Sequence, residues 1–150
     1  MQILSSSTPS TPNILLVDDN GDGLLVRRCL LEEIGCCVKT AVNGEEGLKL
    51  FRAAKFDVVV TDYRMPSMDG AELIQRIRLL DPNARIILLS GFVEPLGLTE
   101  ENTGADAVIA KSANEPARLV RTVRRLVNRA ARKPPGSHEP LQARAKAISQ

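Results

Sequence analysis

Five side chains that could do chemistry each close or directly follow a short apolar run, and they are Asp18, Asp19, Asp62, Ser90 and Lys111. Three carboxylates gathered in one small site repel each other, which raises the pKa of at least one of them unless a cation neutralises the group. Oxygen ligands with no histidine or cysteine nearby suit Mg²⁺, which keeps several of its waters. We therefore predict a Mg²⁺ site in which Asp19 and Asp62 bind the ion directly and Asp18 binds it through water.

The same residues predict that Asp62 accepts a phosphoryl group. A hard cation beside a carboxylate, with an amine and a hydroxyl converging on it, suits the transfer of a phosphoryl group to that carboxylate. Lys111 and the metal would neutralise the phosphoryl oxygens, and the Ser90 hydroxyl would hydrogen-bond one of them. Taken alone, each of these residues is explained equally well by a role as a helix cap or a surface charge. Their shared position at strand ends favours the chemical interpretation.

Five short runs of β-branched and aliphatic residues have the composition of strands buried on both faces of a sheet. They lie at residues 14–17, 38–42, 58–61, 85–89 and 107–110, of which the second and fifth are the weakest. Helical stretches separate them at residues 22–34, 44–53, 70–80 and 114–132, whereas residues 91–104 hold only a poor helix. Such alternation predicts an α/β fold: a doubly wound, five-stranded parallel sheet with helices on both faces. Functional residues then belong at the carboxyl ends of the strands.

The chain of 150 residues, with 43% hydrophobic and 25% charged residues, has the composition of one ordinary globular domain. Residues 1–12 and 133–150 are rich in proline, serine and small residues without an apolar period, so we expect disorder there and a folded domain over residues 13–132. No apolar run approaches the roughly 18 residues that span a bilayer, and residues 1–12 lack the pattern of a secretory signal. These features predict a cytoplasmic protein without a membrane segment.

The three cysteines fit that compartment. The chain has an odd number of cysteines, at positions 29, 36 and 37, and two of them are adjacent. None lies at metal-ligand spacing from another cysteine or a histidine. Disulfides are rare in the cytosol, where thiols stay reduced. We therefore expect all three to be reduced, small core residues.

Apolar spacing also predicts which faces of two helices are buried. In helix 22–34 the core side is predicted to carry Val26, Leu30 and Ile34. Three leucines are then expected to be exposed and available to a partner protein, and they are Leu24, Leu25 and Leu31. In helix 114–132 the residues predicted to pack on the sheet are Leu119, Val123, Leu126, Val127 and Ala130. Its outer face is then strongly basic, with Arg118, Arg121, Arg125, Arg129 and Arg132.

Four motifs resemble those of the receiver domain of two-component response regulators. They are VDDN at residues 17–20, DYRMPSMDG at 62–70, LLSG at 88–91 and AK at 110–111. The resemblance covers residues 13–132 and implies the flavodoxin-like receiver fold, with Asp62 taking phosphate from a histidine kinase. It also implies that the acid pair at 18 and 19 holds Mg²⁺ and that Ser90 and Lys111 contact the phosphoryl group. The backbone carbonyl of Arg64 is implied as a further metal ligand.

Two positions depart from the pattern of that family. The lysine is usually followed by proline through a cis bond, and an aromatic residue usually stands three positions before it. Here these positions hold Ser112 and Val108. A cis bond before a residue other than proline costs about 2.5 to 4 kcal/mol, so we expect the bond between Lys111 and Ser112 to be trans. The departures bear on how phosphorylation is reported and not on phosphorylation itself.

The sequence therefore predicts a phosphoacceptor response regulator whose phosphorylation switches a protein-binding surface. It is expected to be a switch and not an enzyme, apart from its own phosphorylation and slow self-dephosphorylation. The expected partner is a sensor histidine kinase or phosphotransfer protein, and a second copy of the chain is a further candidate. Direct contact with nucleic acid is not expected, because no nucleic-acid-binding motif accompanies the basic helix.

Three alternatives stay open. A phosphatase with an aspartate nucleophile would use the same metal and lysine, although its usual second acid, two residues after the nucleophile, is replaced here by Arg64. A flavodoxin-like cofactor domain is disfavoured because the first loop, DDNGDG, is acidic where a phosphate cradle is neutral or basic. The sequence is also compatible with a receiver fragment of a larger regulator or hybrid kinase.

Overall fold

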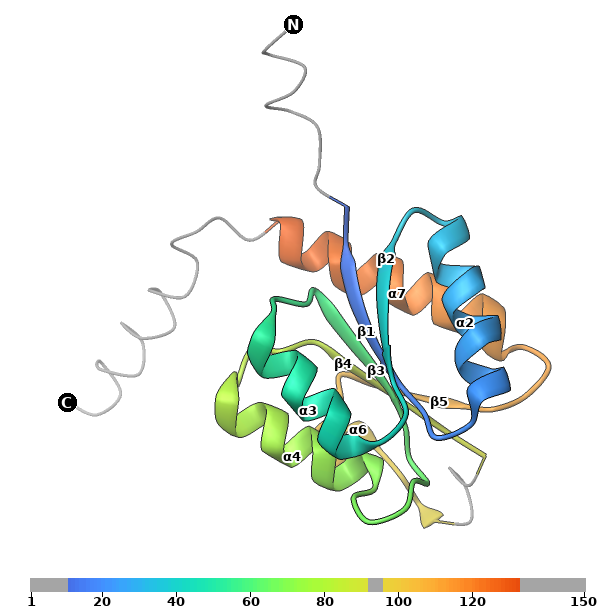
Figure 1. Ribbon diagram of the computed structural model, residues 1–150. Coiled ribbons are helices and arrows are strands. Elements are labelled where there is room, and N and C mark those ends of the chain that lie inside the picture. The colour runs from blue at the N-terminus through green and yellow to red at the C-terminus, as the bar shows by residue number, and fades with distance from the viewer. Residues whose placement is uncertain (1–10, 92–95, 133–150) are drawn as a thin grey trace, which may run out of the picture.

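The computed structural model describes residues 11–91 and 96–132 and shows a five-stranded parallel sheet between two layers of helices (Figure 1). The strands are β1 (Asn13–Val17), β2 (Cys37–Ala41), β3 (Val58–Asp62), β4 (Ile86–Ser90) and β5 (Ala107–Ala110). Their order in the sheet is β2-β1-β3-β4-β5, so the first strand lies inside the sheet and the chain winds outward in both directions. The predicted doubly wound fold is confirmed.

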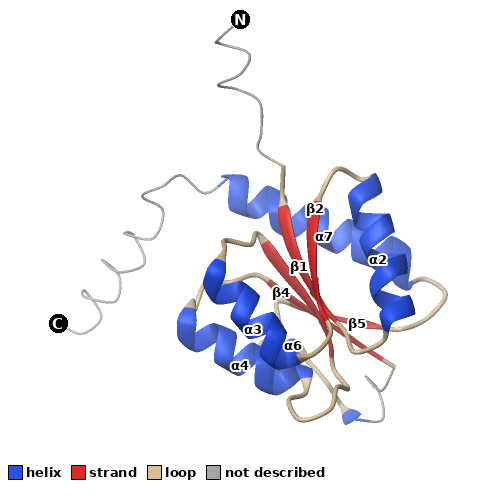
Figure 2. Ribbon diagram, viewed as in Figure 1, coloured by secondary structure: helices blue, strands red, loops and turns tan. Residues whose placement is uncertain are grey.

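Helices cover both faces of the sheet. They are α2 (Gly21–Glu33), α3 (Gly44–Ala53), α4 (Gly70–Leu80), α6 (Glu100–Thr103) and α7 (Glu115–Arg132). Helices α2 and α7 lie on one face, and α3 and α4 lie on the other (Figure 2). The four predicted helices agree with α2, α3, α4 and α7 to within one residue at each end. Disorder was predicted for residues 1–12 and 133–150, and all of these except Thr11 and Pro12 lie outside the described residues.

Alternate residues of the strands contribute to two separate cores, which explains why the strand sequences are continuously apolar. Ile14 and Leu16 of β1 belong to the core under α2 and α7, whereas Leu15 and Val17 belong to the core under α3 and α4. Because side chains alternate across a sheet, a strand covered on both faces has no polar face. Every residue of β3 and β4 is buried. The polar residues of these two strands all lie at their carboxyl ends, and they are Thr61, Asp62 and Ser90.

Side-chain caps fix where three helices begin after the strand-end loops. The side chain of Asn20 accepts hydrogen bonds from the backbone N–H groups of Asp22 and Gly23, at 2.9 and 3.1 Å. Asn43 caps α3 and Asp69 caps α4 in the same way. Each cap satisfies N–H groups that a helix leaves without an intrahelical partner. The starts of α2, α3 and α4 are thereby held at the edge of the sheet where the strands end.

The buried face of α2 differs from the predicted one. Leu24 and Leu31 are buried, with exposed fractions of 6% and 0%, whereas Val26 is 64% exposed. Between the two buried leucines this face carries Arg27, so the inward stripe runs through a charged side chain that apolar spacing cannot detect. Leu25 is exposed, as expected. The other two residues predicted to face the core are only partly buried, and they are Leu30 and Ile34.

We expect Leu31→Ala to lower the free energy of unfolding by about 2 to 5 kcal/mol, because it leaves a cavity between α2 and the sheet. Leu25→Ala, on the exposed side of the same helix, is the matched control and should change the free energy by less than about 0.5 kcal/mol. Urea-induced unfolding followed by circular dichroism measures both values. Similar losses in the two variants would show that α2 buries a different face.

The prediction of three core cysteines is wrong for two of them. All three are free thiols, but only Cys36 is buried, and Cys29 and Cys37 are exposed. Cys37 begins β2, which is an edge strand whose first and third residues face outward. Cys29 lies two positions after Arg27, on the outer side of α2. Small size alone does not place a cysteine in a core when the element that carries it has an exposed face.

Helix α7 is amphipathic as predicted. Leu119, Val123 and Leu126 are buried, and Val127 packs against them from a partly buried position. The arginines at 118, 121, 125 and 129 are exposed and form a basic outer face. The side chains of Ala130 and Arg132, which were predicted to extend these two faces, lie outside the described part of the structure. No helix among the described residues is both long enough and apolar enough to cross a membrane.

Candidate functional site

Three carboxylates meet at the carboxyl edge of the sheet. One oxygen from each of Asp18, Asp19 and Asp62 lies within 4.8 Å of the others. Asp18 and Asp62 are buried, whereas Asp19 is exposed. The acids meet because β1 and β3 are neighbours in the sheet, with Val17 beside Thr61 in the register. The structure thus brings together the three acids singled out in the sequence, and their oxygens form the kind of donor set that a hard divalent cation prefers.

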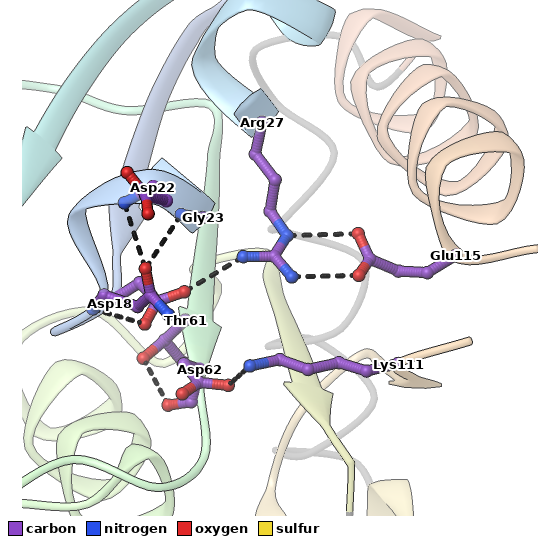
Figure 3. Close-up of polar contacts among 9 residues, drawn as sticks. Asp18, Asp22, Gly23, Arg27, Thr61, Asp62, Lys111 and Glu115 are labelled. Carbon is purple, nitrogen blue, oxygen red and sulfur yellow. Dashed lines mark hydrogen bonds and ion pairs between the residues drawn. The ribbon is translucent and has the colours of Figure 1, made fainter. Parts of the chain in front are cut away.

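Asp62 closes β3 and is paired with Lys111 from the loop after β5 (Figure 3). The Lys111 Nζ lies 2.6 Å from Oδ1 of Asp62, and the lysine backbone N–H donates to the carbonyl of Ser90 at 2.9 Å. Burial raises the pKa of the Asp62 carboxyl above its ordinary value; the hydrogen bond from Lys111 lowers it, and the negative charge of Asp18 raises it. The net shift is upward, because the effect of burial is larger than that of the hydrogen bond from Lys111.

Asp18 forms an ion pair with Arg27, a residue that was not predicted from the sequence to belong to the site. The Arg27 Nη1 donates to Oδ2 of Asp18 at 2.9 Å, and the backbone N–H of Asn20 donates to Oδ1 at 3.0 Å. Arg27 also makes a two-pronged ion pair with Glu115 at the start of α7, with Nε and Nη2 at 3.0 and 2.9 Å from the carboxylate oxygens (Figure 3). The sequence carries one signal for this role. Arg27 follows Leu24 by three residues, in a helix whose apolar residues do not define a single buried face.

Ser90 and Arg64 occupy the positions that the strand pattern assigns to them. Ser90 is the last residue of β4, is buried, and stands beside Ala110 in the register. Because Asp62 pairs with Leu89 in the ladder between β3 and β4, Ser90 lies at the same edge of the sheet as the acid. Arg64 follows Asp62 by two residues and has an exposed side chain. The roles of the Ser90 hydroxyl and the Arg64 carbonyl stay predictions.

The loop after Asp62 folds tightly back on the acid. The backbone N–H of Gly70 donates to the carbonyl of Tyr63 at 2.7 Å, and that of Met68 donates to Pro66 at 2.7 Å. A Cβ atom at position 70 would lie 2.4 Å from the backbone oxygen of Asp62. The glycine is therefore required for space. The left-handed backbone of this loop falls on Ser67, with φ of 69°.

The two departures near Lys111 have simple structural outcomes. No peptide bond in the described part of the chain is cis, so the bond between Lys111 and Ser112 is trans, as expected. Val108 is partly buried and packs against the core under α3 and α4. Its aliphatic side chain offers no ring that could turn between an inward and an outward position.

Residues 14–124 match the family described as the response regulator receiver domain. The chain belongs to this family. The resemblance inferred from the motifs is thereby confirmed, and the chain contains a receiver domain of two-component signalling. The match covers the five strands, apart from Asn13 at the start of β1, and the first half of α7. The edge that carries Asp18, Asp62, Ser90 and Lys111 therefore lies within it.

Curated relatives of this receiver domain include regulators and sensor proteins. A response regulator receiver protein from Anaeromyxobacter sp. (strain Fw109-5) is 38% identical over 103 residues, which are 68% of this chain and 43% of that protein. The virulence sensor protein BvgS of Bordetella pertussis is 42% identical over 78 residues, which are 49% of this chain and 6% of that protein. The chain spans about half or less of the length of the curated relatives it matches.

Solved structures show the same fold. The response regulator TrrA of Thermotoga maritima, in complex with Mg²⁺ and BeF, is 34% identical. The match covers 77% of this chain and 99% of that one, with a TM-score of 0.71. The receiver fold therefore accounts for the sheet order and for the helices on both of its faces.

Proposed function

We propose that the chain is a phosphoacceptor switch in which Asp62 takes a phosphoryl group from a phosphohistidine, in a Mg²⁺-dependent reaction. The observation that carries this proposal is the surroundings of Asp62: two further carboxylates lie within 4.8 Å and the Lys111 Nζ lies at 2.6 Å. An isolated buried acid needs one counter-charge, whereas three acids beside Lys111 and Arg27 still carry excess negative charge and suit a divalent cation together with an anionic substrate. The donor of the phosphoryl group would be a sensor histidine kinase or a phosphotransfer protein.

The residues present fit a magnesium ion. The donor set consists of carboxylate oxygens, which are the ligands that Mg²⁺ prefers. Asp19 and Asp62 would hold the ion directly and Asp18 through water, with the backbone carbonyl of Arg64 as a further ligand. When bound, Mg²⁺ would neutralise the acids and the oxygens of the incoming phosphoryl group. The similarity to TrrA, which was solved with Mg²⁺ and BeF, supports this assignment.

The chain's own residues then have defined tasks in the transfer. A carboxylate oxygen of Asp62 attacks phosphorus, so that an O–P bond forms while the P–N bond to the donor imidazole breaks. The departing imidazole keeps the electron pair and takes up a proton from water. Lys111 has three N–H donors and one-third of its side chain exposed, which lets it move from Asp62 to a phosphoryl oxygen. Ser90 would donate its hydroxyl to another of these oxygens.

The phosphorylated state is proposed to act by changing a protein-binding surface in the cytoplasm. The exposed arginines of α7 and the exposed Leu25 of α2 offer surfaces of opposite character for a downstream partner, a kinase or a second copy of the chain. No catalytic activity is proposed beyond the chain's own phosphorylation and slow self-dephosphorylation, and no direct contact with nucleic acid. Because Val108 has no ring, the signal would not use a turning aromatic side chain.

A receiver within a larger signalling protein is a second candidate for the same chemistry. The match to BvgS, in which the aligned part is 6% of a much longer sensor protein, favours it. The phosphorylation step would be the same in both cases. An aspartate phosphatase gains no such support, because the position of its second acid holds Arg64, whose side chain is exposed.

The test is incubation of the wild-type chain with Mg²⁺ and acetyl phosphate, followed by measurement of the intact mass. We expect a gain of one phosphoryl group per chain. A parallel sample with a chelator in excess over Mg²⁺ should keep the unmodified mass. Absence of the gain in the sample with Mg²⁺, or an equal gain with the chelator, would contradict the proposal.

A further inference from the structure

Arg27 joins the acid site to the last helix through two ion pairs. One edge of its guanidinium contacts Asp18 at 2.9 Å, and the other contacts both carboxylate oxygens of Glu115, at 2.9 and 3.0 Å. Figure 3 shows the side chain reaching from α2 between the two acids. Its side chain is only 12% exposed, and both acids are buried. Charged groups this deep in a protein require partners, because an unpaired buried charge is strongly destabilising.

The neighbouring backbone leaves space for this guanidinium. A Cβ atom at Gly23 would lie 2.9 Å from Nη1 of Arg27 and 3.1 Å from Oδ2 of Asp18. Any larger residue at position 23 would therefore crowd the contact between Arg27 and Asp18. Gly23 thus leaves room for the contact between Arg27 and Asp18, and Arg27 lies on the same helix face as the buried Leu24 and Leu31.

The charge of Arg27 persists inside the protein. Burial lowers the pKa of Arg27, but the hydrogen bonds and charge of Glu115 and the charges of Asp18 and Asp62 outweigh it, and the pKa is raised overall. The pocket therefore contains a permanent positive charge close to the acids that would hold a cation. Glu115 cancels part of that charge on the side away from the acids.

We infer that Arg27 is a built-in counter-ion of the acid site that weakens Mg²⁺ binding, and that Glu115 in the first turn of α7 limits this effect. The inference rests on the Mg²⁺ site of the proposed function and adds its regulation. The positive charge of Arg27 repels Mg²⁺, and its guanidinium occupies one oxygen of Asp18. The site therefore binds Mg²⁺ less tightly than the same three carboxylates would without Arg27. Metal occupancy is thereby linked to the ion pair that ties α2 to α7.

The inference predicts that replacing Arg27 and replacing Glu115 change the affinity for Mg²⁺ in opposite directions. We expect Arg27→Gln to bind Mg²⁺ about tenfold more tightly than wild type, which corresponds to about 1.4 kcal/mol of repulsion removed. Glu115→Gln should bind Mg²⁺ more weakly, because Arg27 then acts on the acids without its second partner. The double variant should bind Mg²⁺ about as tightly as Arg27→Gln, because among the described residues Glu115 contacts the site only through Arg27. The Kd is obtained by titrating Tm with Mg²⁺, which needs no phosphorylation.

Arg28→Gln is the matched control, because it removes one positive charge from the next residue of the same helix. Arg28 is half exposed and pairs with Glu32 on the surface, so its loss should leave the Kd for Mg²⁺ within about twofold. A purely structural role for Arg27 would lower Tm without metal and leave the Kd unchanged, which would overturn the inference. A weaker Kd in Arg27→Gln would overturn it as well. If Arg27→Gln does not fold, Glu115→Gln decides, and a Kd equal to or tighter than wild type contradicts the inference.

The outcome separates this inference from the proposed function. If the wild type gains no stability from Mg²⁺, the metal site of the proposed function fails and the inference fails with it. If the wild type responds to Mg²⁺ and Arg27→Gln responds with the same Kd, the metal site stands and only the role of Arg27 is refuted.

Discussion

Asp62→Asn is expected to fold and to gain no phosphoryl group from acetyl phosphate and Mg²⁺. The amide has nearly the shape of the acid but lacks the carboxylate oxygen that attacks phosphorus. Because burial raises the pKa of Asp62, its ionisation costs the folded state free energy as the pH rises through that pKa. The amide removes this cost, so the variant should be at least as stable as wild type at neutral pH. Intact mass and thermal unfolding measure the two outcomes.

Asp57→Asn is the control for this experiment. Asp57 lies just before β3, at the opposite end of the strand, where its carboxylate accepts a hydrogen bond from the backbone N–H of Asn13. That variant should be labelled to the same extent as wild type. Labelling of Asp62→Asn at the wild-type level would place the phosphoryl group on another residue, and loss of labelling in Asp57→Asn would show that the assay is not specific for the site.

Millimolar Mg²⁺ is expected to raise Tm in the wild type and to have almost no effect on Asp19→Ala. A ligand that binds only the folded state at 100 times its Kd adds about 2.7 kcal/mol of stability. For a domain of this size, that corresponds to a rise of roughly 5 to 10 °C in Tm. Asp19 is exposed, so its removal should not unfold the protein, and loss of one repelling carboxylate should leave Tm without metal no lower than in wild type.

Asp22→Ala is the matched control for the metal experiment. Asp22 is an exposed acid three residues further along, in the first turn of α2, and it is not one of the three acids whose oxygens cluster. Its removal should leave the response to Mg²⁺ intact. An equal rise in Tm for Asp19→Ala and wild type would contradict the placement of the metal between Asp19 and Asp62.

The parallel sheet explains why so much of the fold was predictable. Strands such as β3 and β4 are buried on both faces, so their sequences carry an unbroken apolar signal that ends where the polar residues begin. Helix α2 was the exception. Its buried stripe contains Gly23 and Arg27, and neither adds to an apolar period, so the spacing of the remaining leucines and valines indicated the wrong face. A buried ion pair leaves no trace in a hydrophobic pattern.

The candidate site was predictable in its acids and lysine for the same geometric reason. Parallel strands end at one edge, so residues that close them must lie near each other, whatever their separation in sequence. The Arg27 and Glu115 pair does not follow from that rule, because the two residues are 88 positions apart on helices. In the sequence, Arg27 and Glu115 cannot be distinguished from ordinary surface charges until the packing of α2 against α7 is known. The closeness of Gly70 to the Asp62 carbonyl was not predictable either, because it depends on how the loop folds back onto the strand end.

The most direct test of the account locates the phosphoryl group on the wild-type chain. After incubation with Mg²⁺ and acetyl phosphate, borohydride reduces an aspartyl phosphate to the corresponding alcohol, which converts that aspartate into homoserine. Peptide mass spectrometry then identifies the converted position. We predict homoserine at Asp62 and unchanged aspartate at Asp18 and Asp19. Conversion at either of these two acids, or at no acid in a sample exposed to donor and metal, would contradict the assignment of Asp62 as the phosphoacceptor.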